Sequence, residues 1–168
     1  RFRKKFSFVQ VAVPTRKVEP FLSYRKGVER RINHINRKYG DGLWNPIIYF
    51  DVKLDQERLS ALYRLADIAI ISSIYDGMNL VAKEFLASQV DEKGVLLLSE
   101  FAGAAEEIPG AMLINPYDIE GCADEIKRAL ERPQRDRVAA IRMAREYVRE
   151  NNIFRWVNDV IEEIQAIG

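Results

Sequence analysis

Apolar residues along this chain fall into short continuous runs that alternate with amphipathic segments. Runs rich in Val, Ile, Leu and Phe are typical of buried strands, and they cover residues 6–13, 47–52, 67–72, 94–100 and 111–116. Elsewhere apolar positions recur every three or four residues, which predicts helices. The expected helices are 18–39, 56–66, 79–89, a short one within 102–108, and then 118–132, 133–151 and 153–167.

Strand runs that are apolar at nearly every position belong to parallel strands with both faces covered. Five such runs alternating with helices predict an α/β fold with a doubly wound, mainly parallel, Rossmann-like sheet. We expect a single domain over residues 1–168, in which helices 118–167 form a C-terminal tail. Asp118 is the expected N-cap of one tail helix, and Pro133 is expected near the first position of the next.

The composition fits a globular protein and narrows its partners. The 168 residues are 48% hydrophobic and 30% charged, with a net charge of +1, which gives no reason to expect a nucleic-acid or membrane partner. A single cysteine, Cys122, and a single histidine, His34, exclude a disulfide within the chain and a Cys/His zinc cluster. His34 lies in a charged helical stretch and is expected at the surface. One cysteine fits a reducing cytoplasm, which is the expected location. No apolar run approaches the roughly 20 residues of a membrane span.

In an open parallel sheet, ligands bind beyond the carboxyl ends of the strands. The corresponding loops are residues 14–16, 51–55, 72–79, 99–103 and 115–118. Glycine leads into a helix in two of them, but neither matches GxGxxG or the phosphate loop GxxxxGK[ST], so a dinucleotide fold or a P-loop kinase is unsupported. The small residues of the segment FAGAAEE favour close packing over ligand contact. Arg16 follows a strand end and has the chemistry to clamp a phosphate.

The segment YDGMNLVAKEF, residues 75–85, carries the richest chemistry. Gly77 lets backbone approach a ligand without a Cβ in the way. The amides that follow, of Met78, Asn79 and Leu80, are unpaired donors at the positive end of a helix dipole. Such a helix start suits a phosphate or sugar hydroxyls.

Two carboxylates flank this helix start. Asp76 precedes it and has acceptor oxygens for hydroxyls, whereas Glu84 lies one turn beyond Leu80 on the same face. A carboxylate there suits a vicinal diol such as the 2′- and 3′-hydroxyls of ribose. The spacing also fits a plainer interpretation, in which Asp76 and Gly77 are turn residues before a capped helix and Glu84 is solvated.

Several motifs together resemble a known family. DGMNLVAKEF, LSEFAGAAEE and NPYD, in this order, are similar to the C-terminal half of trehalose-6-phosphate synthase, and FVQVAVPTR and INRKYG fit it too. The resemblance implies a retaining glycosyltransferase of the GT-B type with two Rossmann-like domains. It implies glucose transfer from UDP-glucose, or another nucleotide glucose, to glucose 6-phosphate, with no metal or covalent cofactor. Front-face transfer is then expected, in which the leaving phosphate helps to deprotonate the acceptor and no protein nucleophile is needed.

The resemblance also implies roles for individual residues. Asp76 would act at the transferred sugar as the catalytic residue, together with the amides that follow it. Glu84 would hold the ribose, Leu54 would touch the uracil, and Arg16 would reach the phosphate of the acceptor. The implied donor-binding residues are Leu54, Gly77, Met78, Asn79, Leu80, Val81, Ala82, Lys83 and Glu84.

Tyr75 departs from the family pattern, which usually has arginine before DGMN. This departure keeps two alternatives open: a transferase that makes glucosylglycerol phosphate, and a non-catalytic domain that senses a sugar nucleotide or sugar phosphate.

The acceptor-binding N-terminal half of the family is missing from this sequence, so we expect no transfer by these residues alone. The final helix carries an apolar stripe that would pack on that half and that favours self-association when uncovered. The stripe consists of Phe154, Val157, Val160, Ile161 and Ile164.

Overall fold

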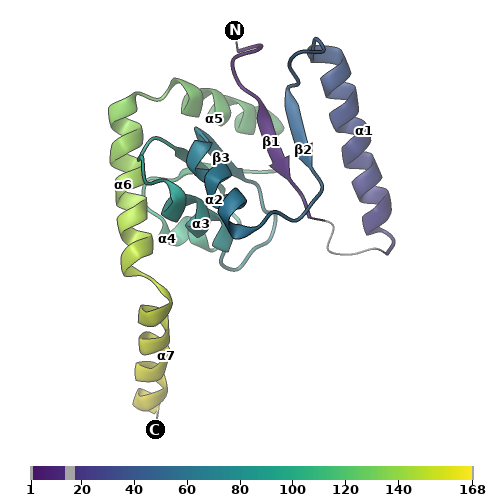
Figure 1. Ribbon diagram of the computed structural model, residues 1–168. Helices are drawn as coiled ribbons and strands as arrows, with labels where there is room; N and C mark the ends of the chain where they lie inside the picture. Colours follow the sequence, from purple (N-terminus) through teal and green to yellow (C-terminus); the bar gives the residue numbers. More distant parts are fainter. Residues whose placement is uncertain (1, 14–17, 168) are drawn as a thin grey trace. The chain divides into compact units, whose positions relative to one another are not determined.

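The computed structural model describes residues 2–13 and 18–167 (Figure 1). Strands and helices alternate along the first two thirds of the chain, and the last third is helical. The elements are β1 (Phe8–Val11), α1 (Phe21–Tyr39), β2 (Ile47–Phe50), α2 (Gln56–Leu65), β3 (Ile68–Ile71), α3 (Leu80–Ser88), β4 (Val95–Ser99), α4 (Ala104–Glu107), β5 (Met112–Ile114), α5 (Ile119–Glu131), α6 (Gln134–Glu150) and α7 (Ile153–Ile167).

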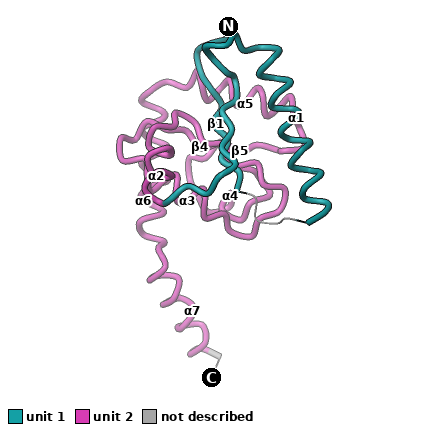
Figure 2. Tube along the Cα trace, turned by 45° about the vertical axis from the view of Figure 1, so that its right-hand side comes forward, with its two compact units in different colours: residues 1–55 teal, residues 56–168 magenta. Residues whose placement is uncertain are grey.

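The chain divides into two compact units (Figure 2). Unit 1 comprises residues 1–55 and contains β1, α1 and β2, and unit 2 comprises residues 56–168 and contains the remaining elements. Each unit has its own hydrogen-bonded parallel sheet, with strand order β1-β2 in unit 1 and β3-β4-β5 in unit 2. The single domain expected over residues 1–168 stays a prediction.

In unit 1, α1 packs against β2 of the two-stranded sheet. Ile32 is the buried residue of this helix. The side chain of Asn36 ties the end of the helix to the start of the strand, because its Nδ2 donates to the carbonyl of Ile47 at 2.9 Å and its Oδ1 accepts from the Ile47 amide at 3.0 Å. Val9 and Ile48 stay exposed, since α1 is the single helix among the described residues of this unit.

In unit 2, the central strand β4 is buried at every position, as its continuous apolar run predicts. Alternate side chains of a strand point to opposite faces of the sheet. Leu96 and Leu98 accordingly join a core cluster with α3 and α6, whereas Val95 and Leu97 join a second cluster with α5. The parallel strands and the helices on both faces confirm the expected α/β fold class.

The expected helices and strands all form, with ends that lie at most three residues inside the expected ranges. Asp118 caps α5, because its Oδ1 accepts from the Gly121 amide at 2.9 Å, and Pro133 directly precedes α6. His34 is exposed on α1, as expected.

Helix α7 is exposed along the whole part for which side chains are described, residues 153–166. The apolar stripe, Phe154, Val157, Val160, Ile161 and Ile164, is therefore uncovered. Self-association through this stripe stays a prediction. Among the described residues, no helix combines the length and the apolar character that crossing a membrane requires.

Candidate functional site

The candidate site lies where β3 ends and the chain turns into α3, at the carboxyl edge of the parallel sheet of unit 2. Asn79 begins the helix as its N-cap, with a left-handed backbone at φ 74°. Its Oδ1 accepts a hydrogen bond of 2.8 Å from the Ala82 amide, and the residue is buried. Asparagine suits this position because it tolerates the left-handed conformation and caps well.

Asp76 organises the loop before that cap. Its Oδ1 accepts from the amide of Met78 at 3.2 Å, and its Oδ2 accepts from Nδ2 of Asn79 at 2.9 Å. The same Nδ2 also donates to the hydroxyl of Ser73 at 3.1 Å. An ionised carboxylate has about four lone-pair sites, so Asp76 retains acceptor capacity for a ligand hydroxyl.

The loop between β4 and α4 is hydrogen-bonded to this loop. The amide of Gly103 donates to the carbonyl of Asp76 at 2.9 Å, and the amide of Ala104 donates to the carbonyl of Met78 at 3.0 Å. The two backbones are so close that a Cβ on Gly103 would lie 2.2 Å from the carbonyl oxygen of Gly77. The small residues of FAGAAEE therefore serve the close packing that the sequence predicts.

Gly77 itself faces open space. A Cβ added there would meet nothing within 4 Å, and its φ lies outside the left-handed region. Neither packing nor backbone conformation within the described chain requires a glycine at this position. An exposed glycine without a structural reason fits a place where a ligand approaches the backbone.

The amides at the helix start are partly free. The Met78 amide is occupied by Asp76, but the amides of Asn79, Leu80 and Val81 find no hydrogen-bond acceptor in the part of the chain that the structure describes. Two of the three donors expected from the sequence, those of Asn79 and Leu80, are thus available, and Val81 adds a third. They lie at the positive end of the α3 dipole, which favours an anion.

Glu84 lies one turn into α3 and is held by a residue that sequence reasoning missed. The hydroxyl of Tyr63 on α2 donates to Oε2 of Glu84 at 3.4 Å. Burial, with the nearby carboxylate adding to it, raises the pKa of Tyr63 to about 12. Tyr63 appears in the sequence as one apolar position of an amphipathic helix, and nothing in the local pattern signals its contact with Glu84.

The remaining expected site residues differ in their surroundings. Ala82 is fully buried in the core, and its amide is taken by the cap. The ammonium of Lys83 pairs with Glu107 of α4 at 3.0 Å, whereas Leu80 and Val81 are exposed. Leu54 is half-buried in unit 1, which is described separately, and Arg16 lies outside the described residues. Tyr75 is 97% exposed.

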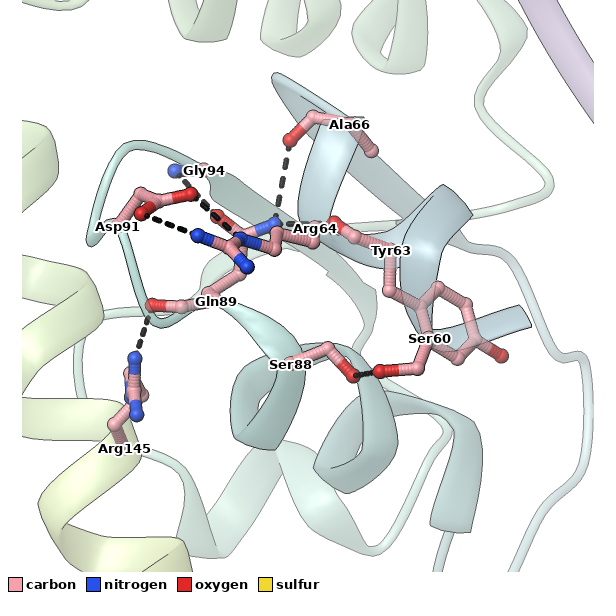
Figure 3. A network of polar contacts seen from close by, with 9 residues as sticks. All are labelled: Ser60, Tyr63, Arg64, Ala66, Ser88, Gln89, Asp91, Gly94 and Arg145. Atoms are coloured by element: carbon pink, nitrogen blue, oxygen red, sulfur yellow. Dashed lines mark hydrogen bonds and ion pairs between the residues drawn. The ribbon is translucent and has the colours of Figure 1, made fainter. Parts of the chain in front are cut away.

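A buried amide at the C-terminal end of α3 connects three segments of unit 2, and it too was missed (Figure 3). Gln89 is fully buried. Its Nε2 donates to the carbonyl of Tyr63, and to that of Ala66 at 3.4 Å. Its Oε1 accepts from the Gly94 amide at 2.9 Å, and its own carbonyl accepts from Arg145 on α6. The end of α2, the end of α3 and the start of β4 are thereby held together.

These features define a class: an α/β protein with parallel strands and, at the carboxyl edge of its sheet, a helix start with the donors and acceptors that suit an anion and hydroxyl groups. The family model of glycosyltransferase family 20 matches residues 1–166. The chain belongs to glycosyltransferase family 20, as the sequence motifs indicated.

Individual relatives agree with this assignment. The chain is 40% identical over 164 residues to α,α-trehalose-phosphate synthase [UDP-forming] A of Dictyostelium discoideum. This match covers 97% of this chain and 22% of the relative. A solved α,α-trehalose-phosphate synthase (UDP-forming) from Burkholderia xenovorans, in complex with glucose-6-phosphate, superposes with a TM-score of 0.92 at 39% identity and covers 97% of this chain and 36% of that one. The E. coli protein bound with UDP-2-fluoro glucose superposes with a TM-score of 0.92 at 34% identity. The match covers 96% of this chain and 36% of that one. The chain thus spans about a fifth to a third of the length of these proteins.

Proposed function

We propose that this chain is the donor-binding part of a retaining glucosyltransferase. The whole protein transfers glucose from UDP-glucose, or another nucleotide glucose, to glucose 6-phosphate and forms trehalose 6-phosphate. The observation that carries the proposal is the start of α3. An open Gly77 and free amides stand there, and Glu84 lies one helical turn beyond Leu80, in a chain related over nearly its whole length to such synthases.

The geometry suits a nucleotide sugar that lies with its sugar at Asp76 and its ribose at Glu84. The amides of Asn79, Leu80 and Val81 are the donors for the diphosphate, on which negative charge grows as the glycosidic bond breaks. Fixed backbone amides stabilise such charge without having to reorganise. Asp76 precedes the helix and accepts from hydroxyls of the transferred sugar, and Glu84 lies further along the helix and accepts from the ribose.

The reaction proposed is front-face transfer, in which the leaving phosphate helps to remove the proton of the acceptor hydroxyl. It uses no protein nucleophile and no metal or covalent cofactor. Acceptor binding belongs to the part of the protein that the relatives have and this sequence does not include, with Arg16 reaching the acceptor phosphate from this side. We therefore expect the 168 residues alone to bind the donor without turning it over.

A calorimetric titration with UDP, ADP, GDP and their glucose conjugates tests the proposal. We expect saturable binding by the unchanged chain, with the strongest response to a uridine nucleotide, and loss of that binding on Glu84→Ala. Glu162→Ala is a matched control, because it removes the same charge from the exposed surface of α7 and should leave the affinity unchanged. Failure to bind any of these nucleotides would favour the non-catalytic alternative.

Tyr75 is the residue that favours the two alternatives, a glucosylglycerol-phosphate-forming transferase and a non-catalytic sensing domain. It is almost fully exposed directly before Asp76, where the family pattern has a cation. A neutral side chain there gives up one charge next to the donor phosphates, so Tyr75→Arg should tighten the binding of UDP-glucose. A variant that binds UDP-glucose no more tightly than the unchanged chain would contradict this role for position 75.

A further inference from the structure

Tyr63 of α2 makes three described contacts with α3 and its C-cap, Gln89. Its hydroxyl donates to Glu84 at 3.4 Å, and its ring meets that of Phe85 edge to face, with centroids 6.3 Å apart. Its backbone carbonyl accepts from the buried side chain of Gln89 (Figure 3). Backbone and ring are thus both fixed, so the position of the hydroxyl beside Glu84 is set by the packing of two helices.

We infer that Tyr63 is a positioning residue that orients the Glu84 carboxylate for the ribose hydroxyls of a bound nucleotide. The inference rests on the proposed function, since it gives Glu84 the ribose as its ligand. Tyr63 approaches one carboxylate oxygen, Oε2, and no other described residue donates to the Glu84 side chain. The second oxygen, and the remaining lone pairs of the first, are therefore left for a diol.

The geometry explains why a tyrosine at this place improves binding. A free glutamate side chain loses rotamer freedom when it is fixed, which costs free energy. A donor that already restricts it reduces the part of this cost that falls on ligand binding. At 3.4 Å the hydrogen bond is long, and bonds of this kind in ligand-free sites commonly tighten when the ligand is present.

The protonation state of the phenol is consistent with its role as a donor. Burial and the neighbouring carboxylate raise the pKa of Tyr63 to about 12, so the hydroxyl keeps its proton at neutral pH and remains a donor. Phenylalanine would preserve the ring contact with Phe85 and the backbone carbonyl bond to Gln89. The substitution Tyr63→Phe therefore isolates the hydroxyl.

The test compares UDP with 2′,3′-dideoxy-UDP, which lacks the diol, on the unchanged chain and on Tyr63→Phe. We expect Tyr63→Phe to weaken UDP binding about five-fold, the loss of a modest hydrogen bond to a charged group, and to leave 2′,3′-dideoxy-UDP binding unchanged. Ser60→Ala is the matched control: it removes the 3.1 Å contact between the hydroxyls of Ser60 and Ser88 in the same α2–α3 interface. It should not change the affinity for either nucleotide.

A second measurement needs no nucleotide. The pKa of Tyr63 can be measured by following its phenol carbon by NMR. This pKa should be lower in Glu84→Gln than in the unchanged chain, because the substitution removes the carboxylate and leaves the burial. An unchanged pKa would overturn the contact on which the inference rests.

The outcomes separate the inference from the proposed function. Suppose that the unchanged chain binds UDP and Glu84→Ala does not. If Tyr63→Phe then weakens the binding of both nucleotides equally, or of neither, the positioning role is refuted and the proposed function stands. If the unchanged chain binds no nucleotide, the proposed function fails and the inference fails with it.

Discussion

The carbonyl of Gly77 lies against Gly103 of the loop between β4 and α4, and adding one methyl group to each glycine should have opposite effects on stability. A Cβ on Gly103 would lie 2.2 Å from the carbonyl oxygen of Gly77 and 2.9 Å from its carbonyl carbon. Both atoms belong to backbone that is itself fixed by hydrogen bonds from Gly103 and Ala104, so no flexible side chain can move aside. Overpacking of this kind costs about 1–3 kcal/mol, and we expect Gly103→Ala near the upper end of that range.

Gly77→Ala should behave differently. The added methyl meets nothing within 4 Å and the backbone φ is one that alanine adopts. Replacing glycine where the fold permits it restricts the unfolded chain and stabilises by about 0.4–1 kcal/mol. The same methyl, however, stands where a ligand would approach the backbone, so under the proposed function it lowers the affinity for UDP.

Thermal unfolding followed by circular dichroism, together with UDP titration, checks both halves of this prediction. For a chain of this size, 1 kcal/mol shifts the Tm by about 2–4 °C, so Gly103→Ala should lower the Tm by roughly 6–12 °C, and Gly77→Ala should not lower it. A Gly103→Ala variant as stable as the unchanged chain would refute the close approach of the loops. Normal UDP affinity in Gly77→Ala would refute the claim that Gly77 is open for a ligand.

Three further predictions concern other parts of unit 2. Gln89→Leu should cost about 2–4 kcal/mol in urea unfolding, because it leaves the buried Gly94 amide without its acceptor; a smaller loss than 1 kcal/mol would contradict this. Stability should fall as the pH rises from about 10 to 12, because Tyr63 keeps its proton in the fold up to a pKa of about 12 while the unfolded chain loses it. The contribution of Tyr63, reduced by partial exposure to about 1 kcal/mol, should be lost in Tyr63→Phe, so the fall should be smaller in that variant. Ile161→Glu in α7 should reduce the concentration dependence of light scattering, and a chain that is strictly monomeric before the substitution would count against self-association.

The fold could be predicted almost completely because its signals are local. The run Val95–Ser99 is apolar throughout and forms the buried central strand, and the cap at Asp118 follows from an acidic residue before an amphipathic run. Unit 1 shows where such signals end: the runs at residues 6–13 and 47–52 predict covered strands, yet side chains such as Val9 and Ile48 are exposed. How much a strand is covered depends on neighbours that the strand sequence does not specify.

The site could be predicted only in part, because its supporting contacts join residues far apart in the sequence. Gly77 and the free amides lie in one continuous motif, so the motif was sufficient to find them. Tyr63 lies 21 residues before Glu84, and Gln89 joins segments 26 residues apart. Nothing in the apolar period of α2 distinguishes a tyrosine that fills the core from one that also orients a carboxylate.

The two interpretations of the helix start that the sequence left open turn out not to exclude each other. The cap exists, but its acceptor is Asn79, which satisfies the Ala82 amide and leaves those of Leu80 and Val81 without an acceptor in the described chain. Asp76 holds the cap in place through the amide group of Asn79 and still has lone pairs to offer. The interactions that stabilise the turn thus also fix the free donors and the carboxylate in position before any ligand arrives, which is what a preorganised anion site requires.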